Sequence, residues 1–291
     1  MPGSELSLHV TDAYRAELRA LQDAAAAVVR IGWRRLQAAE LEATYESWLT
    51  TVASAVTATQ LRAVALSGGY LSAFLTSELG RAADAPSVAP QEPYAGISRD
   101  GRAVRDAYRS PLIAVLARLK RGEPLDRALA VGQRRALFMV GLDIDHAAQG
   151  SLFDGMAGDD RFSGWRRAVR GTCGACLADT RSYARDVGEP MRRHPHCQCI
   201  AEPGVRGVLE RHRRPSGDEI FAAMAPREQD LAVGPRVAEA IRQGEISLGA
   251  LLGHSHQETA DDFITQAAVL AATDPAPGKD REHNRKEGQG A

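Results

Sequence analysis

The chain has 291 residues, of which 44% are hydrophobic and 25% are charged, a composition typical of globular proteins with room for about two domains. Its 36 basic and 37 acidic residues leave a net charge of −1, which excludes the overall basic excess that drives non-specific nucleic-acid binding. There is no apolar run of about 18 residues and no signal-peptide pattern at the amino terminus, so we expect no export and no membrane attachment.

Residues 1–80 carry apolar side chains every three or four positions, the spacing of one helical face. This pattern predicts two long antiparallel helices. Thr11 or Asp12 is the expected cap of the first helix, because short polar side chains accept hydrogen bonds from the first free N–H groups. Gly68 and Gly69 are expected to kink or break the second helix.

Residues 81–102 contain three prolines and no sustained period, and we predict an exposed loop there. Residues 103–158 return to the helical pattern and are expected to complete a bundle. Pro111 suits the first turn of one helix, and Pro124 opens the next.

The pattern changes after Gly150, and we place a domain boundary near Asp159. Residues 159–205 are predicted to form a small module that contains all the cysteines. Residues 206–271 are predicted to form a subdomain of short helices, with helical patterns at 217–224, 237–243 and 248–252. The tail at 272–291 has no aliphatic side chain larger than alanine, so we expect it to be disordered.

Trp165 lies in an alternating segment and is followed by three arginines, Arg166, Arg167 and Arg170. An exposed aromatic ring beside guanidinium groups could contact nucleic acid or an acidic partner. A strand whose two faces alternate explains the same pattern without any ligand. Both interpretations stay open at this point.

The four cysteines all lie between residues 173 and 199, which is too tight a cluster to arise by chance. Cys173 and Cys176 form a C-x2-C turn. Twenty residues lie between Cys176 and Cys197, which belongs to the segment HPHCQC together with His194, His196 and Cys199. If Cys197 and Cys199 lie on a strand, their side chains share a face. The spacing predicts tetrahedral zinc held by four thiolates, or by three thiolates and one imidazole.

The sequence allows other uses of these cysteines. A redox C-x-x-C pair would need a strand-to-helix turn, and no such pattern surrounds Cys173. Disulfides pairing Cys173 with Cys199 and Cys176 with Cys197 would need an oxidising compartment. His194 and His196 can each be a ligand, a hydrogen-bond donor to a ligand, or neither. A site filled by four protein ligands is closed, so the predicted metal is structural.

The order GTCGAC at 171–176, Tyr183, and HPHCQC at 194–199 followed by Ile200 and Pro203 resembles the carboxy-terminal module of the phage Mu F-like minor head proteins. In that family a C-x2-C pair precedes an H-P-x-C-x-C segment that runs into a short strand ended by a proline. The segments GWRRAVR at 164–170, 215–230 and 234–245 also resemble the versions found in actinobacterial tailed phages. The resemblance is strongest over residues 160–265.

The resemblance implies a minor capsid or head-morphogenesis protein with a structural Zn²⁺ site. It implies Cys173, Cys176, His194, Cys197 and Cys199 as the residues that match the metal-binding pattern, whereas His196 occupies the variable position. It also implies portal and major capsid proteins as partners, contact with packaged double-stranded DNA, and a location inside the capsid after assembly in the host cytoplasm.

Two enzyme alternatives remain. Relatives in actinobacterial phages are often described as capsid maturation proteases, but the chain has no G-x-S-x-G, H-E-x-x-H or phosphate-loop motif. Its one hydroxyl between imidazoles, Ser255, lies in an expected polar loop. A zinc-stapled nuclease would need histidine and asparagine near the cysteine pairs, and residues 177–193 have neither. Asp143, Asp145 and His146 are expected on a solvated helix face.

We therefore predict a mainly α protein, α+β overall. It has an amino-terminal helical bundle, a small zinc-stapled α+β module and short helices. Its expected role is structural, with no catalytic residues.

Overall fold

The computed structural model describes residues 3–83, 92–169, 173–180, 182–184, 191, 197, 199–208 and 215–252. The protein is mainly helical with one small sheet, as the sequence predicted. It consists of two compact units: the first contains helices α1 to α5 and the sheet, and the second contains helices α6 to α9. The predicted tail at 272–291 and the predicted sites at Arg170, His194, His196 and Ser255 lie outside the described residues.

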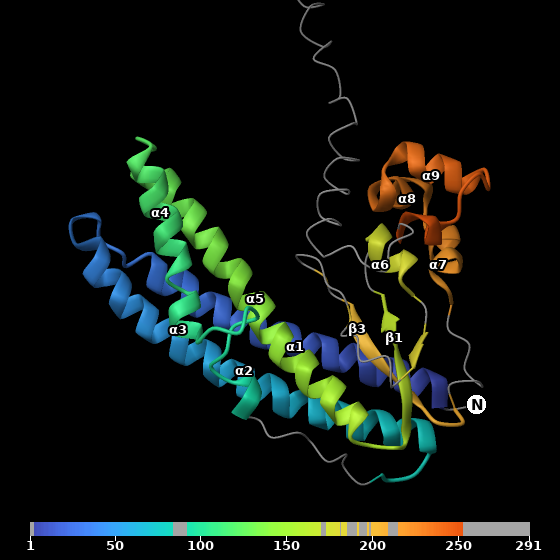
Figure 1. Ribbon diagram of the computed structural model, residues 1–291. Helices are drawn as coiled ribbons and strands as arrows, with labels where there is room; N and C mark the ends of the chain where they lie inside the picture. Colours follow the sequence, from blue (N-terminus) through green and yellow to red (C-terminus); the bar gives the residue numbers. More distant parts are fainter. Residues whose placement is uncertain are drawn as a thin grey trace, which may run out of the picture. The chain divides into compact units, whose positions relative to one another are not determined.

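The first unit is built on two long antiparallel helices, α1 (Gly3–Trp33) and α2 (Leu41–Leu79) (Figure 1). Helix α1 begins eight residues before the expected cap. Thr11 lies inside it, where its hydroxyl donates to the Ser7 carbonyl at 3.0 Å. The cap prediction is therefore wrong: Ser7 and Thr11 are buried, and the Thr11 hydroxyl lies 3.0 Å from the Tyr70 hydroxyl of α2, so contact with α2 continues before the expected cap.

Helix α2 runs without a break through Gly68 and Gly69, so the predicted break does not occur. Buried side chains precede and follow the glycine pair, among them Val64, Tyr70 and Leu71, and their packing supports the helix on both sides of it. The helix ends at Gly80, whose left-handed φ of 66° suits glycine and whose N–H donates to the Thr76 carbonyl.

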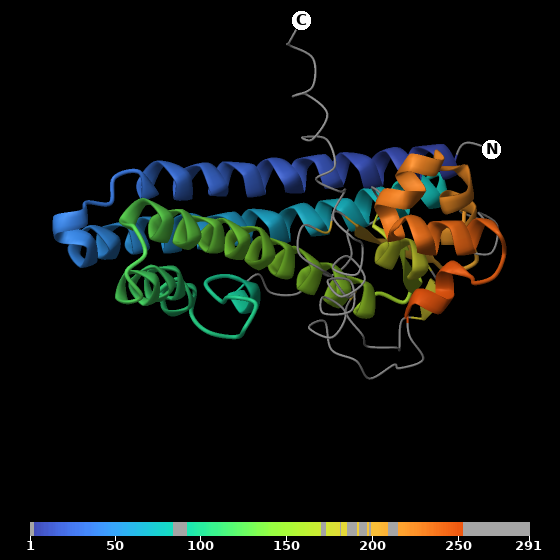
Figure 2. The same cartoon turned by 90° about the horizontal axis from the view of Figure 1, so that it is seen from above.

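Three further helices complete the bundle: α3 (Val104–Ala107), α4 (Ser110–Lys120) and α5 (Leu125–Ala157). Pro111 lies in the first turn of α4 and Pro124 directly precedes α5, as predicted. Seen from above in Figure 2, α5 runs along α1 and α2 while the short α4 packs on the first half of α5. A turn of 3-10 helix at Glu92–Tyr94 lies in the segment predicted as a loop.

Hydroxyl groups connect the three long helices inside the core. The Tyr14 hydroxyl lies 2.9 Å from the Ser67 hydroxyl, which in turn donates to the Ala148 carbonyl at 2.8 Å. The Tyr14 ring stacks on Tyr70, with ring centroids 4.3 Å apart. Buried hydroxyls need such partners to avoid a desolvation cost, so these bonds fix how α1, α2 and α5 align along their axes.

A three-stranded antiparallel sheet follows the bundle, with β1 (Phe162–Ala168) between β2 (Ser182–Ala184) and β3 (Ile200–Val205). All six residues of β3 are buried. Pro203, expected at the end of a strand, lies inside β3, where an edge position tolerates its missing N–H.

The sheet belongs to the same compact unit as the bundle, so the fold does not divide at Asp159. Arg15 of α1 donates to the Ala168 carbonyl at the end of β1, at 3.1 Å. Phe153 of α5 packs edge-on against Trp165 of β1, with ring centroids 5.2 Å apart. These long-range contacts join the strand to the helices, and local composition does not reveal them.

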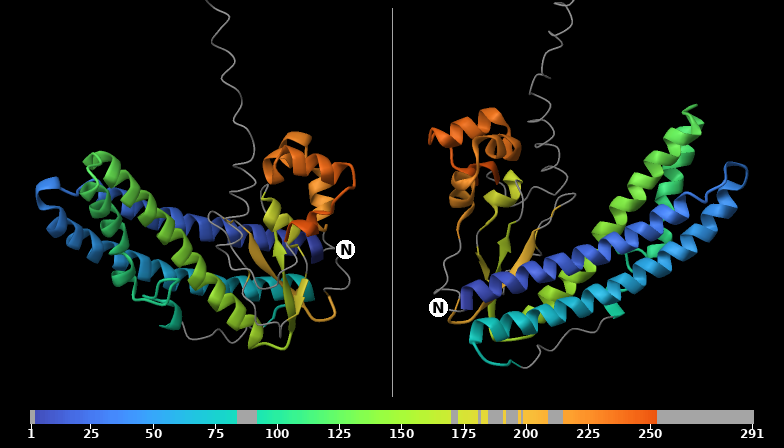
Figure 3. Two further views of the ribbon diagram at one scale, coloured as in Figure 1. Left: turned by 45° about the horizontal axis from the view of Figure 1, so that its top comes forward. Right: turned by 180° about the vertical axis from the view of Figure 1, so that it is seen from behind.

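The second unit contains α6 (Gly174–Ala178), α7 (Gly217–Ala223), α8 (Pro226–Val233), α9 (Pro235–Arg242) and the 3-10 helix η4 (Leu248–Leu252) (Figure 3). A capping box starts α7, in which Ser216 and Glu219 bond reciprocally to each other's backbone. Helix α8 was not predicted, because its exposed residues include Leu231 and leave no apolar period.

Candidate metal centre

Three cysteines form a compact cluster. The Sγ atoms of Cys176, Cys197 and Cys199 lie within 4.8 Å of one another, and all three residues are buried. Cys176 lies on α6, and the other two directly precede β3. None of the four cysteines, which all fall in the described part of the chain, is in a disulfide. Residues far apart in the sequence are thus brought together as thiols.

The local structure before β3 does not meet the condition under which the two cysteines would share a strand face. The strand begins at Ile200, so Cys197 and Cys199 are not on a strand, and no shared strand face directs them. Both are nevertheless buried, with exposed fractions of 9% and 1%. The two cysteines are brought together by the irregular backbone that precedes β3.

Cys173 is placed by the start of α6. It precedes the helix with extended backbone angles, and its carbonyl accepts from the Leu177 N–H at 3.0 Å, so Cys173 and Cys176 flank a single turn. Cys173 is half-buried and is not one of the three cysteines whose sulfur atoms meet within 4.8 Å. His194, the other expected ligand, lies outside the described residues.

The cluster suits a thiophilic metal ion. In tetrahedral zinc–thiolate sites the Zn–S bonds are about 2.3 Å long, which places neighbouring sulfur atoms about 3.8 Å apart. The three sulfur atoms lie within 4.8 Å of one another, which is compatible with that separation, and burial keeps water from competing for the ion. The donor set therefore fits a soft or borderline divalent metal, such as those that thiolates select.

Arg167 touches this cluster. Its Nη1 lies 4.0 Å from the Cys197 Sγ, and the residue is only 5% exposed. The sequence left a nucleic-acid or partner contact open for Arg167 and did not indicate its position beside Cys197. The only available signal was its place on a strand close in sequence to the cysteine turn.

Trp165 and Arg166, two further residues of the possible nucleic-acid contact, are also largely covered by the protein. Trp165 is 5% exposed, so the interpretation that requires an exposed aromatic ring does not hold. Arg166 lies directly across from Glu202 on β3, and its Nε donates to Glu202 at 2.9 Å. The strand interpretation explains Trp165, Arg166 and Arg167 as packed or paired side chains.

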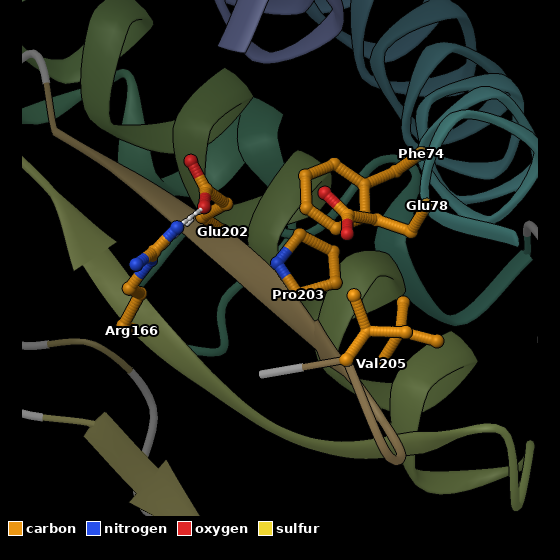
Figure 4. A pocket seen from close by; sticks show the side chains of 7 residues that line it. Phe74, Glu78, Arg166, Glu202, Pro203 and Val205 are labelled. Atoms are coloured by element: carbon orange, nitrogen blue, oxygen red, sulfur yellow. Dashed lines mark hydrogen bonds and ion pairs between the residues drawn. The ribbon is translucent and has the colours of Figure 1, made fainter. Parts of the chain in front are cut away.

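The Arg166–Glu202 pair borders a small pocket between the sheet and the end of α2 (Figure 4). Phe74, Glu78, Pro203 and Val205 line it as well. The guanidinium reaches across to the Glu202 carboxylate, while Pro203 and Val205 present apolar surface. The lining contains no serine, threonine, cysteine, lysine or histidine, and we assign the pocket no chemistry.

Asp143 is buried rather than solvated, which corrects the prediction for that residue. It is 2% exposed, and its Oδ1 accepts from the Ser98 hydroxyl at 2.9 Å and from the Arg99 N–H at 2.8 Å. His146 is exposed, as expected. Asp143 thus fastens the loop before α3 to helix α5.

No known protein family, curated protein or solved structure matches the chain. Among the helices of the described residues, none combines the length and apolarity that crossing a membrane requires. The function is therefore inferred from the chain's own residues.

Proposed function

We propose that the protein is a structural protein whose cysteine module holds Zn²⁺, and that it acts as a minor capsid or head-morphogenesis protein of a tailed bacteriophage. The observation that carries the metal part is the buried group of Cys176, Cys197 and Cys199. The phage part is supported by the order of the C-x2-C and H-P-x-C-x-C segments, which resembles the phage Mu F-like proteins.

The ion would be held by these three thiolates and by one further ligand, Cys173 or His194. Four protein ligands leave no open coordination position, which favours a structural role over catalysis. When bound, zinc supplies a cross-link between segments that are distant in sequence. The residues themselves bury the thiolates and orient them.

The phage role defines the expected partners and place. Portal and major capsid proteins are the proposed protein partners, and packaged double-stranded DNA is a further one. The proposed site of action is the capsid interior, reached by assembly in the host cytoplasm. Capsid maturation protease activity is the alternative, which the experiments below separate from a structural role.

The metal is tested by measuring zinc in protein purified under reducing conditions. We expect one equivalent in the wild type and loss of zinc in Cys176→Ser, because structural zinc binds with an apparent free energy of about 10–16 kcal/mol that a weak hydroxyl ligand cannot sustain. Ala175→Ser, the same hydroxyl one residue away on α6, is the matched control and keeps its zinc. A wild type without zinc refutes the site.

The fourth ligand is identified by Cys173→Ser and His194→Ala in the same assay. The variant that loses zinc, or binds it with a lower affinity, carries the ligand. Retention of full affinity in both variants contradicts a centre of four protein ligands from this set.

The phage role is tested on purified virions of a phage that encodes this chain. Quantitative mass spectrometry is expected to find the protein at low copy number. Incubation with the cognate major capsid protein is expected to leave that protein intact. Discrete cleavage products that disappear in Ser255→Ala would establish the protease alternative instead.

A further inference from the structure

We propose that Arg167 stabilises the metal–thiolate centre by donating a hydrogen bond to the Cys197 sulfur and by offsetting the negative charge of the bound thiolates. This inference rests on the proposed metal site and deepens it. The contact that carries it is the one between Arg167 Nη1 and Cys197 Sγ, 4.0 Å apart at a buried position.

The position of Arg167 in the sheet directs its side chain to this sulfur. Arg167 lies opposite Ala201 on β3, and Ala168 lies opposite Ile200, the first residue of that strand. Cys199 and Cys197 come immediately before Ile200, so the end of β1 runs beside the cysteine segment. The guanidinium therefore reaches Cys197 within the same compact unit.

Electrostatics explains why a cation is useful there. Zn²⁺ with four thiolates carries a net charge of −2, and with three thiolates and an imidazole it carries −1. A buried excess charge of this kind is unfavourable unless an opposite charge lies close to it. Arginine stays protonated at every relevant pH, so Arg167 supplies a permanent positive charge at the sulfur.

The chemistry of the pair points the same way. A guanidinium N–H forms a stronger hydrogen bond to an ionised acceptor than to a neutral one. Hydrogen bonds to metal-bound ligands orient those ligands, and their removal typically costs about 10- to 100-fold in metal affinity. Arg167 is thus assigned a positioning role for Cys197 and is not itself a ligand.

The test compares Arg167→Met, which removes both charge and donor, with Arg167→Lys, which keeps the charge. Zn²⁺ affinity is measured by competition with a chromophoric chelator, and Co²⁺ is used as a spectroscopic probe. We expect the Met variant to bind about 10- to 100-fold more weakly and its sulfur-to-cobalt charge-transfer band to move to lower energy, because an unsupported thiolate gives up charge more easily. The Lys variant should regain part of the affinity.

Arg206→Met is the matched control, because Arg206 follows β3, is exposed and donates to the Asp160 carbonyl. It should leave the affinity and the cobalt spectrum unchanged. Circular dichroism verifies that each variant is folded. If Arg167→Met is not folded, the Zn²⁺ affinity and the cobalt spectrum of Arg167→Lys are compared with those of the wild type instead.

The outcomes separate this inference from the metal site itself. Wild-type affinity and an unshifted band in Arg167→Met overturn the role of Arg167 and leave the metal site standing. A Lys variant as weak as the Met variant overturns the charge contribution. A wild type that binds neither Co²⁺ nor Zn²⁺ overturns the metal site and the role of Arg167 together.

Discussion

Asp143 shows how one buried carboxyl group should make stability depend on pH. Burial raises the pKa of Asp143 above its usual value of 3.8, although the hydrogen bonds from Arg99 and Ser98 oppose the shift. Between 3.8 and the raised pKa, the folded protein holds a proton that the unfolded chain releases. The contribution of Asp143 to the free energy of unfolding therefore falls as the pH rises through that interval.

Asp143→Asn should remove this decrease, because asparagine keeps an acceptor oxygen for Ser98 and Arg99 without a charge. As the pH rises from about 3.8 upward, we expect the unfolding free energy of the variant to increase relative to that of the wild type. Urea titrations at a series of pH values measure the difference. Asp143→Ala serves as the control, losing about 1–3 kcal/mol because buried donors are left unsatisfied. A constant difference between Asn variant and wild type would contradict the prediction.

Arg166 and Glu202 form the second residue-scale test. The Glu202 side chain is 1% exposed and that of Arg166 is 14% exposed, so the carboxylate depends on its protein partners rather than on water. Arg166→Met should cost about 3–5 kcal/mol, the typical penalty for removing one partner of a buried pair. Adding Glu202→Gln should recover part of that loss. Equal stabilities of the single and double variants in chemical denaturation would show that the charge of Glu202 needs no partner.

Helix α5 depends on a glycine where it crosses its neighbours. A methyl group at Gly132 would lie 2.5 Å from Val115 Cγ2 and 2.8 Å from Trp33 Cζ2, both from buried side chains. Gly132→Ala is expected to lower the free energy of unfolding, because overpacking costs about 1–3 kcal/mol and exceeds the helix-propensity gain of about 1 kcal/mol. Gly141→Ala on the same helix meets no atom within 4 Å and should instead be neutral or stabilising.

Helix α2 gives the opposite prediction at Gly69. This residue is exposed, and a methyl group there would contact nothing within 4 Å. Since the helix is continuous, Gly69→Ala should stabilise the protein by about 0.5–1 kcal/mol through its lower conformational entropy when unfolded. Thermal unfolding measures the gain. A loss of stability would indicate that α2 requires a flexible point at the glycine pair.

At the scale of the whole molecule, metal removal should affect the long helices less than the segments that carry the cysteines. Helices α1, α2 and α5 have 31, 39 and 33 residues and contain no cysteine. We therefore expect a strong chelator under reducing conditions to lower the midpoint of thermal unfolding while most of the far-ultraviolet helical signal persists at 25 °C. The stabilisation lost should grow with the free zinc concentration before chelation. Collapse of the helical signal on chelation would contradict this independence.

Much of the helical bundle could be predicted because its apolar period is local. The ends of helices were less predictable: α1 begins before Thr11 because packing on α2 extends the helix beyond its local capping signal. Helix α8 was not predicted, because Leu231 is exposed and the helix contributes little to the core. The grouping of the cysteines as thiols was predictable from their spacing, whereas the irregular backbone at Cys197 and the contact with Arg167 depend on long-range contacts of the sheet.

The hydroxyl bonds inside the bundle also determine how it would respond to force. Tyr14, Ser67 and the Ala148 carbonyl link α1, α2 and α5 in one chain of bonds, and the stacked rings of Tyr14 and Tyr70 lie beside it. A load along the long axis would have to break these bonds and separate the rings before any helix could slide past another. These buried contacts therefore oppose the sliding of α1, α2 and α5 along one another.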